Sequence, residues 1–209
     1  MGITTIEGPM GTGKTLTMAY FMVNDYLNSL KIIDPTTEEP MFPEGCSLYS
    51  TFHFRPPIPF RLFDVDEMQQ MLALVDAAHA EYGDQYTFRD PFEGCSIGLD
   101  ESYLFFDNRR SAANNNLLFN ALLARTRKLE ANIYITVLSI NDIDKRIRRF
   151  VTTRIKPRSA PNSWVKLFMK DLRSGRSVRA KFWGPSYYQF YDTGERVGIP
   201  KHLLKQAGA

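Results

Sequence analysis

The chain of 209 residues has little cysteine and histidine and lacks a long apolar run. Cys46 and Cys95 are too few for a disulfide framework, and neither has another Cys or a His at zinc-like spacing. No window of about 18 residues is uniformly apolar, so no membrane-spanning helix is predicted. The first residues also lack the pattern of a signal peptide, which favours a soluble protein of the cytoplasm.

Positive charge is scarce in the first half of the chain and abundant in the second. Residues 1–107 hold 5 Lys and Arg against 17 Asp and Glu, whereas residues 108–209 hold 21 against 6. The stretch Lys145–Lys181 contains 13 basic residues and a single acid, Asp171. This division indicates either a polyanion near the second half or oppositely charged faces that meet between subunits. A solvated basic surface is the plain alternative.

Apolar periodicity and chain breakers predict strands that alternate with helices. The expected strands cover residues 2–7, 47–54, 96–99, 133–138 and 151–155. The expected helices cover residues 16–30, 64–80, 111–129 and 141–150, with caps at Asp64 or Asp66 and at Asn141. The alternation predicts an α/β fold with a parallel sheet flanked by helices. Residues 164–172 and 177–183 predict a β-hairpin appended to that sheet.

A glycine-rich loop follows the first expected strand. Its residues, Gly8, Pro9, Met10, Gly11, Thr12, Gly13, Lys14 and Thr15, match the pattern GxxxxGK[ST] in full. Glycines in this pattern let backbone N–H groups surround phosphates, and the helix that begins near Lys14 points its positive dipole end at the same anion. We therefore expect these residues and Leu16 to bind ATP, with Lys14 at the β- and γ-phosphates and Thr15 in the Mg²⁺ shell.

Two acids end the expected strand at residues 96–99. Asp100 and Glu101 would lie at the carboxyl edge of the sheet, where the ligands of parallel sheets bind. We expect Asp100 to hold Mg²⁺ through its water shell and Glu101 to orient or deprotonate the attacking water. A nucleotide kinase has no need of a water-activating acid beside the metal, so the pair favours hydrolysis. Taken alone, the two acids are equally compatible with the start of a surface loop.

In these blocks the chain resembles the Zot (zonular occludens toxin-like) family, which includes filamentous-phage assembly ATPases and is related to the FtsK–HerA group of DNA pumps and packaging ATPases. The resemblance covers residues 3–156, and a weaker similarity extends to residue 193. The matching blocks, in order, are residues 8–17, residues 99–109, residues 124–129 and the strand 133–138 with Ile143-Asp144-Lys145. The resemblance implies a RecA-like ATPase core that works as a homo-oligomeric ring, often a hexamer, in virion assembly or DNA movement.

The resemblance also assigns further residues. Arg109 and Arg127 match family arginines, and either is a candidate arginine finger or sensor of the γ-phosphate; an ordinary ion pair is the alternative. Family members often place a sensor glutamine where this chain has Leu138, so Ser139 or Asn141 takes over or sensing is weaker. Phage assembly members carry a membrane-spanning segment further on. The expectation here is a soluble relative, or a membrane part that has been cut off or is replaced by a partner.

These features together predict an Mg²⁺-dependent ATPase that powers viral DNA packaging, translocation or virion assembly, in the host cytoplasm or on the virion. Residues 1–160 form the expected ATPase core, and residues 161–209 a hairpin and extension packed on it. A nucleotide-switched assembly scaffold with slow hydrolysis and a small nucleotide kinase are the alternatives.

The basic stretch also predicts sequence-independent DNA contact, because aromatic residues are interleaved with its cations. These aromatics are Trp164, Phe168, Phe182 and Trp183. Alternatively, they cover the core edge of the hairpin while the basic side faces an acidic neighbour.

Overall fold

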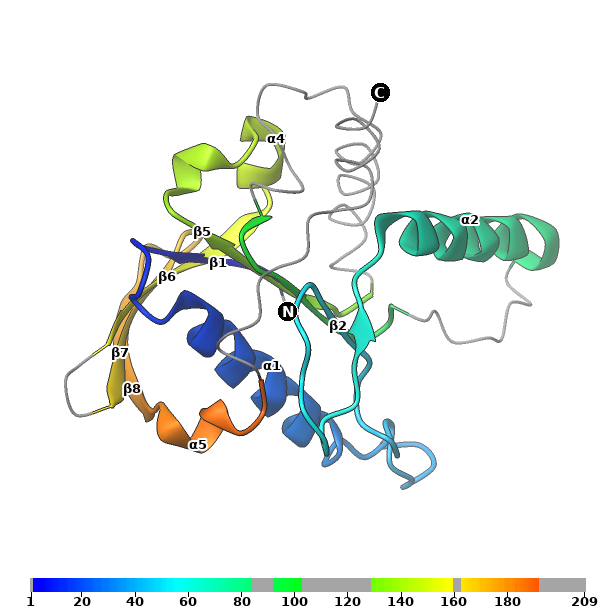
Figure 1. Ribbon diagram of the computed structural model, residues 1–209. Helices are drawn as coiled ribbons and strands as arrows, with labels where there is room; N and C mark the ends of the chain where they lie inside the picture. Colours follow the sequence, from blue (N-terminus) through cyan, green and yellow to red (C-terminus); the bar gives the residue numbers. More distant parts are fainter. Residues whose placement is uncertain (1, 84–91, 103–128, 160–162, 192–209) are drawn as a thin grey trace, which may run out of the picture.

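The computed structural model describes residues 2–83, 92–102, 129–159 and 163–191. Within these ranges the chain forms one sheet with the strand order β3-β2-β4-β5-β1-β6-β7-β8, flanked by helices (Figure 1). The strands are β1 (Gly2–Glu7), β2 (Leu48–Ser50), β3 (Arg61–Leu62), β4 (Ser96–Leu99), β5 (Asn132–Val137), β6 (Val151–Ser159), β7 (Trp164–Asp171) and β8 (Ser177–Trp183). The helices are α1 (Lys14–Ser29), α2 (Val65–Tyr82), the 3₁₀ helix η3 (Ile140–Asp142), α4 (Lys145–Arg148) and α5 (Pro185–Tyr188).

The sheet has a parallel part and an antiparallel part that share β6. The neighbouring strands β3, β2, β4, β5, β1 and β6 pair in parallel. Strands β6 with β7 and β7 with β8 pair antiparallel. Strand β5 lies between β1 and β4, with Glu7 opposite Val137 and Leu99 opposite Ile135. The carboxyl ends of β1, β5 and β4 therefore meet at one edge of the sheet.

In the parallel part of the sheet, apolar side chains cover both faces, as expected for such strands. On one face, α2 and α4 pack against alternate residues of β5, such as Ile133 and Ile135. On the other face, α1 packs against Tyr134 and against β6, β7 and β8. Figure 1 shows α1 and α4 on these opposite faces. The α/β prediction and the antiparallel hairpin are confirmed.

Several predicted boundaries differ from the structure. Strand β2 is shorter than the predicted 47–54, whereas β6 runs past the predicted end at residue 155 to Ser159. The helix expected at 141–150 is divided, and Asn141 as its cap is wrong. Ser139 caps η3 and Asp144 caps α4, because each places a side-chain oxygen on the backbone N–H two residues later.

Two further predictions concern helices. Asp64 caps α2, since its Oδ1 accepts the N–H groups of Asp66 at 2.9 Å and Glu67 at 3.1 Å. The predicted helix 111–129 lies almost wholly outside the described residues. Among the helices that the structure describes, none combines the length and apolarity needed to cross a membrane.

A half-buried carboxylate joins α1 to β4 and β5. Asp25 Oδ2 accepts hydrogen bonds from Ser96 Oγ at 3.0 Å, Asn132 Nδ2 at 3.1 Å and Tyr134 Oη at 2.9 Å. Burial raises the pKa of Asp25, while the three hydrogen bonds oppose that rise. The C-terminal half of α1 is thus fixed to β4 and β5.

Replacement of Asp25 tests this anchor. Asp25→Ala leaves three donors without their acceptor and is expected to lower the free energy of unfolding by roughly 2–4 kcal/mol. Asp25→Asn keeps one carbonyl oxygen as an acceptor, so its loss of unfolding free energy is expected to be clearly smaller. Urea unfolding of the two variants measures the difference; an equal loss in both would show that the acceptor at this position does not matter.

Candidate functional site

The loop from Gly8 to Gly13 leaves the end of β1 and turns into α1. All three of its glycines adopt backbone angles that disfavour side chains, with φ of 155° at Gly8, 78° at Gly11 and 88° at Gly13. A Cβ atom at Gly8 would also lie 2.8 Å from Thr12 Oγ1. Thr12 Oγ1 donates to the carbonyl of Pro9 at 2.8 Å, so the loop is closed by its own hydrogen bond.

The N-terminus of α1 opens onto this loop. Gly13 is its cap and no side chain caps the first turn; the N–H of Thr17 makes a helical bond to the carbonyl of Gly13 at 2.9 Å. Lys14 Nζ donates to the carbonyl oxygens of Gly8 at 2.9 Å and Pro9 at 3.1 Å, which holds the ammonium at the loop. Uncapped N–H groups, the helix dipole and a lysine together form a site for an anion such as a phosphate.

Asp100 follows β4 and connects three other segments. Its Oδ2 accepts from Thr15 Oγ1 at 2.8 Å, and its Oδ1 accepts from Thr136 Oγ1 at 2.5 Å. Its own N–H donates to Thr51 Oγ1 at 2.8 Å. The residue is only 5% exposed. Burial raises the pKa of Asp100, and the hydrogen bonds from Thr136 and Thr15 offset part of that rise.

Glu101 lies beside Asp100 in an unusual backbone conformation. Its φ is 48°, in the left-handed region that residues other than glycine rarely adopt. Its N–H donates to Thr136 Oγ1 at 2.8 Å, and Ser102 Oγ donates to the carbonyl of Thr136 at 3.2 Å. The turn after β4 is therefore fixed to the end of β5, and the side chain of Glu101 is half-buried at the same edge.

A groove of about 460 Å³ runs beside the loop. It is bounded by the loop, by the end of β5 and by β6, and its lining residues are Glu7, Gly8, Pro9, Thr12, Leu138, Ser139, Arg154, Lys156, Pro157 and Arg158. Arg154 Nε and Nη2 each lie 2.6 Å from a carboxylate oxygen of Glu7, and this bidentate pair joins the end of β1 to β6. The groove thus combines the anion-binding loop with cations from the neighbouring strand.

The structure brings most of the predicted site residues together at one edge of the sheet. Residues 8–15, Asp100 and Glu101 meet there through the hydrogen bonds given above. Met10 is 86% exposed on the loop, and the Leu16 side chain belongs to the core, so only the backbone of Leu16 is placed to meet an anion. Arg109 and Arg127 lie outside the described residues.

The three residues considered for a sensing role, Leu138, Ser139 and Asn141, follow the end of β5. Leu138 lines the groove and is 56% exposed. Ser139 also lines it, but its hydroxyl accepts the N–H of Asn141 at 3.2 Å. Asn141 Oδ1 accepts from Arg148 Nη1 at 3.1 Å, so its side chain is held toward α4.

Sequence reasoning missed three residues of this site. Thr136 was treated as part of an apolar strand, yet a lone threonine in the run Ile133–Val137 is the kind of polar residue that marks a strand end at a site. Nothing in the sequence around Thr51 marks it as a residue of the site. Arg154 was counted only as basic surface, although it lies in the predicted strand 151–155 and can pair with Glu7, the acid that ends the predicted strand 2–7.

Comparisons with known proteins agree with this geometry. A family model described as zonular occludens toxin (Zot) matches residues 2–160. The crystal structure of the N-terminal domain of zonular occludens toxin from Neisseria meningitidis has a TM-score of 0.57 at 17% identity, covering 91% of this chain and 98% of that one. The genome packaging NTPase B204 from Sulfolobus turreted icosahedral virus 2, in complex with ATP-gammaS, has a TM-score of 0.51 at 12% identity, covering 87% and 98%. No curated protein matches. At these identities the structural likeness establishes the fold, an α/β P-loop NTPase fold.

The buried carboxyl of Asp100 has a testable effect on stability. Because its pKa is raised in the folded protein, ionised Asp100 costs stability at pH values above its unfolded pKa, and this cost vanishes as the carboxyl is protonated. Asp100→Asn is therefore expected to raise Tm at neutral pH without nucleotide, by about 2–4 °C per kcal/mol relieved. The gain should shrink as the pH falls toward about 4.

Asp171 provides the opposite control. Backbone N–H groups of Ser174 and Arg173 lower the pKa of this exposed carboxyl. Asp171→Asn should therefore give no gain in Tm at neutral pH. Differential scanning fluorimetry across the pH range compares both variants with the parent, and a neutral-pH loss in Asp100→Asn would contradict the assignment.

Proposed function

Because the chain belongs to the zonular occludens toxin (Zot) family, we propose that it is an Mg²⁺-dependent ATPase that powers viral DNA packaging, translocation or virion assembly. The observation that carries the proposal is the hydrogen bond between Thr15, at the start of α1, and Asp100, at the end of β4. It joins the phosphate-binding loop to the acidic pair. The fold of a genome packaging NTPase in complex with an ATP analogue supports the same reading.

The residues at this edge fit a magnesium nucleotide. Thr15 offers a hydroxyl oxygen and Asp100 a carboxylate oxygen 2.8 Å from it, and Mg²⁺ prefers hard oxygen ligands of this kind. Bound there, the ion supplies positive charge against the β- and γ-phosphates. Lys14 and the first N–H groups of α1 hold the same phosphates from the loop side.

Glu101 is the residue that we assign to the attacking water. Its backbone is held in a left-handed conformation by the hydrogen bond to Thr136, next to Asp100, the carboxylate that would hold the metal. Non-glycine residues in such conformations cluster at functional sites, because the surrounding structure must hold them there. A carboxylate at this place can accept a proton from water or orient it for attack on the γ-phosphate.

The remaining assignments extend the proposal to the assembly. Arg109 and Arg127 are proposed as candidate arginine fingers, and Leu138 leaves the sensing role to Ser139, Asn141 or neither. We propose a homo-oligomeric ring, a hexamer in one version, that acts in the host cytoplasm or on the virion in contact with DNA. A slow nucleotide-switched scaffold and a small nucleotide kinase are the outcomes that the tests below distinguish.

Glu101→Gln separates binding from turnover. The variant keeps the shape of the site but loses the basic oxygen, so ATP binding should be retained while the hydrolysis rate falls by roughly 10²- to 10⁴-fold. Glu130→Gln is a matched control, because Glu130 is an exposed glutamate with a φ of 54° that lies next to the opposite end of β5. Phosphate release measures hydrolysis, and titration with a fluorescent nucleotide measures binding. Retained hydrolysis in Glu101→Gln would show that Glu101 does not activate the water.

DNA dependence separates the motor from its alternatives. ATP turnover by the unmodified chain should rise when single- or double-stranded DNA is added, and the rise should fade with increasing salt because phosphate contacts release counterions. Turnover that is slow and indifferent to DNA would favour the scaffold. Transfer of phosphate to a nucleoside monophosphate would favour the kinase.

A further inference from the structure

The outward face of β6, β7 and β8 carries a regular array of cations. We define the basic sheet face as Lys156 and Arg158 of β6, Trp164, Lys166, Phe168 and Lys170 of β7, and Arg179, Lys181 and Trp183 of β8. Neighbours in the sheet form rows across the strands, with Lys156, Phe168 and Arg179 in one row and Arg158, Lys166 and Lys181 in the next. Rows are about 7 Å apart along a strand and strands about 5 Å apart, so the array is a dense grid of charge.

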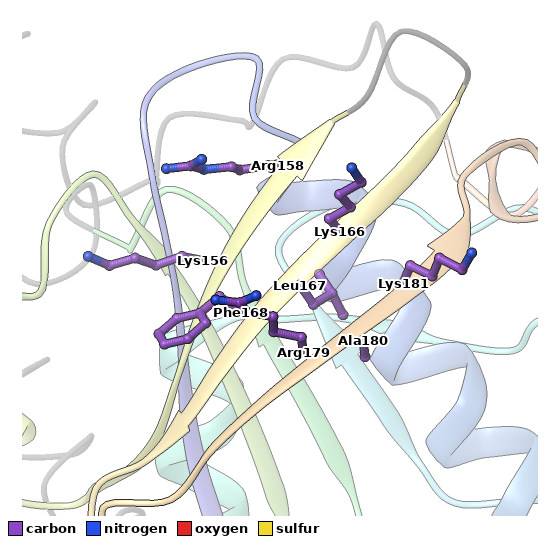
Figure 2. Close-up of a pocket in the computed structure, with 8 residues that line it drawn as sticks. All are labelled: Lys156, Arg158, Lys166, Leu167, Phe168, Arg179, Ala180 and Lys181. Atoms are coloured by element: carbon purple, nitrogen blue, oxygen red, sulfur yellow. The ribbon is translucent and has the colours of Figure 1, made fainter.

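The opposite side of the same strands is apolar. Ile155, Val165, Leu167 and Phe182 are buried there against α1. Figure 2 shows Lys156, Arg158 and Phe168 extending in a common direction from β6 and β7, whereas Leu167 is buried. Of the four aromatics singled out in the sequence, Phe182 therefore covers the core and the other three lie on the outward face.

The cations of this face repel one another without local compensation. Within the described part of the chain, no acidic side chain pairs with Lys156, Arg158, Lys166, Lys170, Arg179 or Lys181. Like charges directly opposite each other in a sheet are destabilising. Lysines on an edge strand can serve to block aggregation, but that role accounts only for β8, whereas the grid extends over the interior strands β6 and β7. The face has the charge pattern of a surface that binds a polyanion.

Exposed aromatic rings narrow the class of polyanion. Phe168 is 41% exposed in the middle of the grid, and Trp183 is 42% exposed at its end. The Trp183 ring meets Trp164 edge to face at a centroid distance of 5.4 Å, and Lys181 Nζ lies 4.7 Å from the Trp164 ring centroid. A duplex keeps its bases stacked inside, so exposed rings between cations suit unpaired bases, which stack on aromatic side chains while lysines and arginines hold the backbone.

From this arrangement we propose that the basic sheet face binds single-stranded nucleic acid. A depression of about 760 Å³ lies within the face, lined by Lys156, Arg158, Lys166, Leu167, Phe168, Arg179, Ala180 and Lys181 (Figure 2). Bases stack on Phe168 and the Trp164–Trp183 pair, and the phosphates follow the cations of β6 and β8. The contact is independent of base sequence, because rings and charges read no base edges.

The face is continuous with the groove beside the phosphate loop. Lys156 and Arg158 line both the 760 Å³ depression and the 460 Å³ groove. A strand on the face thus ends next to the proposed nucleotide site, and two cations are available to the phosphates of either ligand. This link to ATP turnover rests on the proposed function, whereas binding to the face does not require it.

Binding of a labelled oligo-dT by the full chain, followed by fluorescence anisotropy without nucleotide, tests the proposal. Phe168→Ala and Phe168→Leu should both weaken binding by roughly 5- to 100-fold, because leucine cannot replace the stacking ring, and Phe168→Tyr should restore it. For a duplex of the same length as the oligo-dT, these variants should have the same affinity as the parent protein. Tighter binding of the duplex, with no effect of Phe168, would overturn the assignment to single strands.

The charge array is tested by a pair of double variants. Lys166→Gln/Lys181→Gln should weaken oligo-dT binding and reduce the slope of log K against log salt by about 1.4, the value for two lost phosphate contacts on a single strand. Lys145→Gln/Arg149→Gln removes the same charge from exposed positions at α4 and should leave the slope nearly unchanged. Equal losses in both would reduce the face to general basic surface and overturn the proposal.

Two further measurements separate this inference from its competitors. Sedimentation of the free protein should give the same mass for the parent and Lys166→Gln/Lys181→Gln; dissociation of an oligomer in the variant would assign the face to a second copy of the chain. Lys14→Ala should bind oligo-dT like the parent. In the unmodified chain, absence of ATP turnover together with intact oligo-dT binding would refute the proposed function alone, and ATP turnover without oligo-dT binding would refute this inference alone.

Discussion

The carboxylate of Asp100 is the contact on which the geometry of the site depends. Its two oxygens and its N–H hold Thr15 from α1, Thr136 from β5 and Thr51 from the segment after β2. These threonines come from segments far apart in the sequence, and none would be placed correctly by its own strand or helix. Because the carboxylate is buried, each hydrogen bond that it accepts from a threonine hydroxyl offsets part of the cost of its desolvation.

The sequence identified this site where the signal is local. The loop 8–15 and the pair Asp100-Glu101 are contiguous motifs, and each requires only its own neighbours to adopt the right backbone. The order of the strands, by contrast, is set by long-range pairing: nothing near Glu7 indicates that β5 rather than β4 lies beside it. The cap at Asn141 was mispredicted because Ser139, Asn141, Asp142 and Asp144 are all suitable caps, and tertiary packing of Ile143 and Ile147 selects among them.

The two parts of the sheet provide different kinds of surface. In the parallel part, described helices pack on both faces, and ligands of such sheets bind at the edge where the strands end. In the antiparallel part, the described helices cover only the inner face, and among the described residues the outward side chains of β6, β7 and β8 are largely exposed. Strand β6 belongs to both parts, and beyond Ile155 it has lost its pairing with β1, which is why Pro157 is tolerated in its last residues.

The position of β5 between β1 and β4 determines the distance between the glycine-rich loop and the acidic pair. Two strand spacings, about 10 Å, separate the strand that leads into the loop from the strand that carries the acids. The loop and α1 bridge this distance, since Thr15 still reaches Asp100. Backbone pairing thus sets the distance between the loop and the acidic pair, and substitutions in the loop can alter what the loop binds without altering that distance.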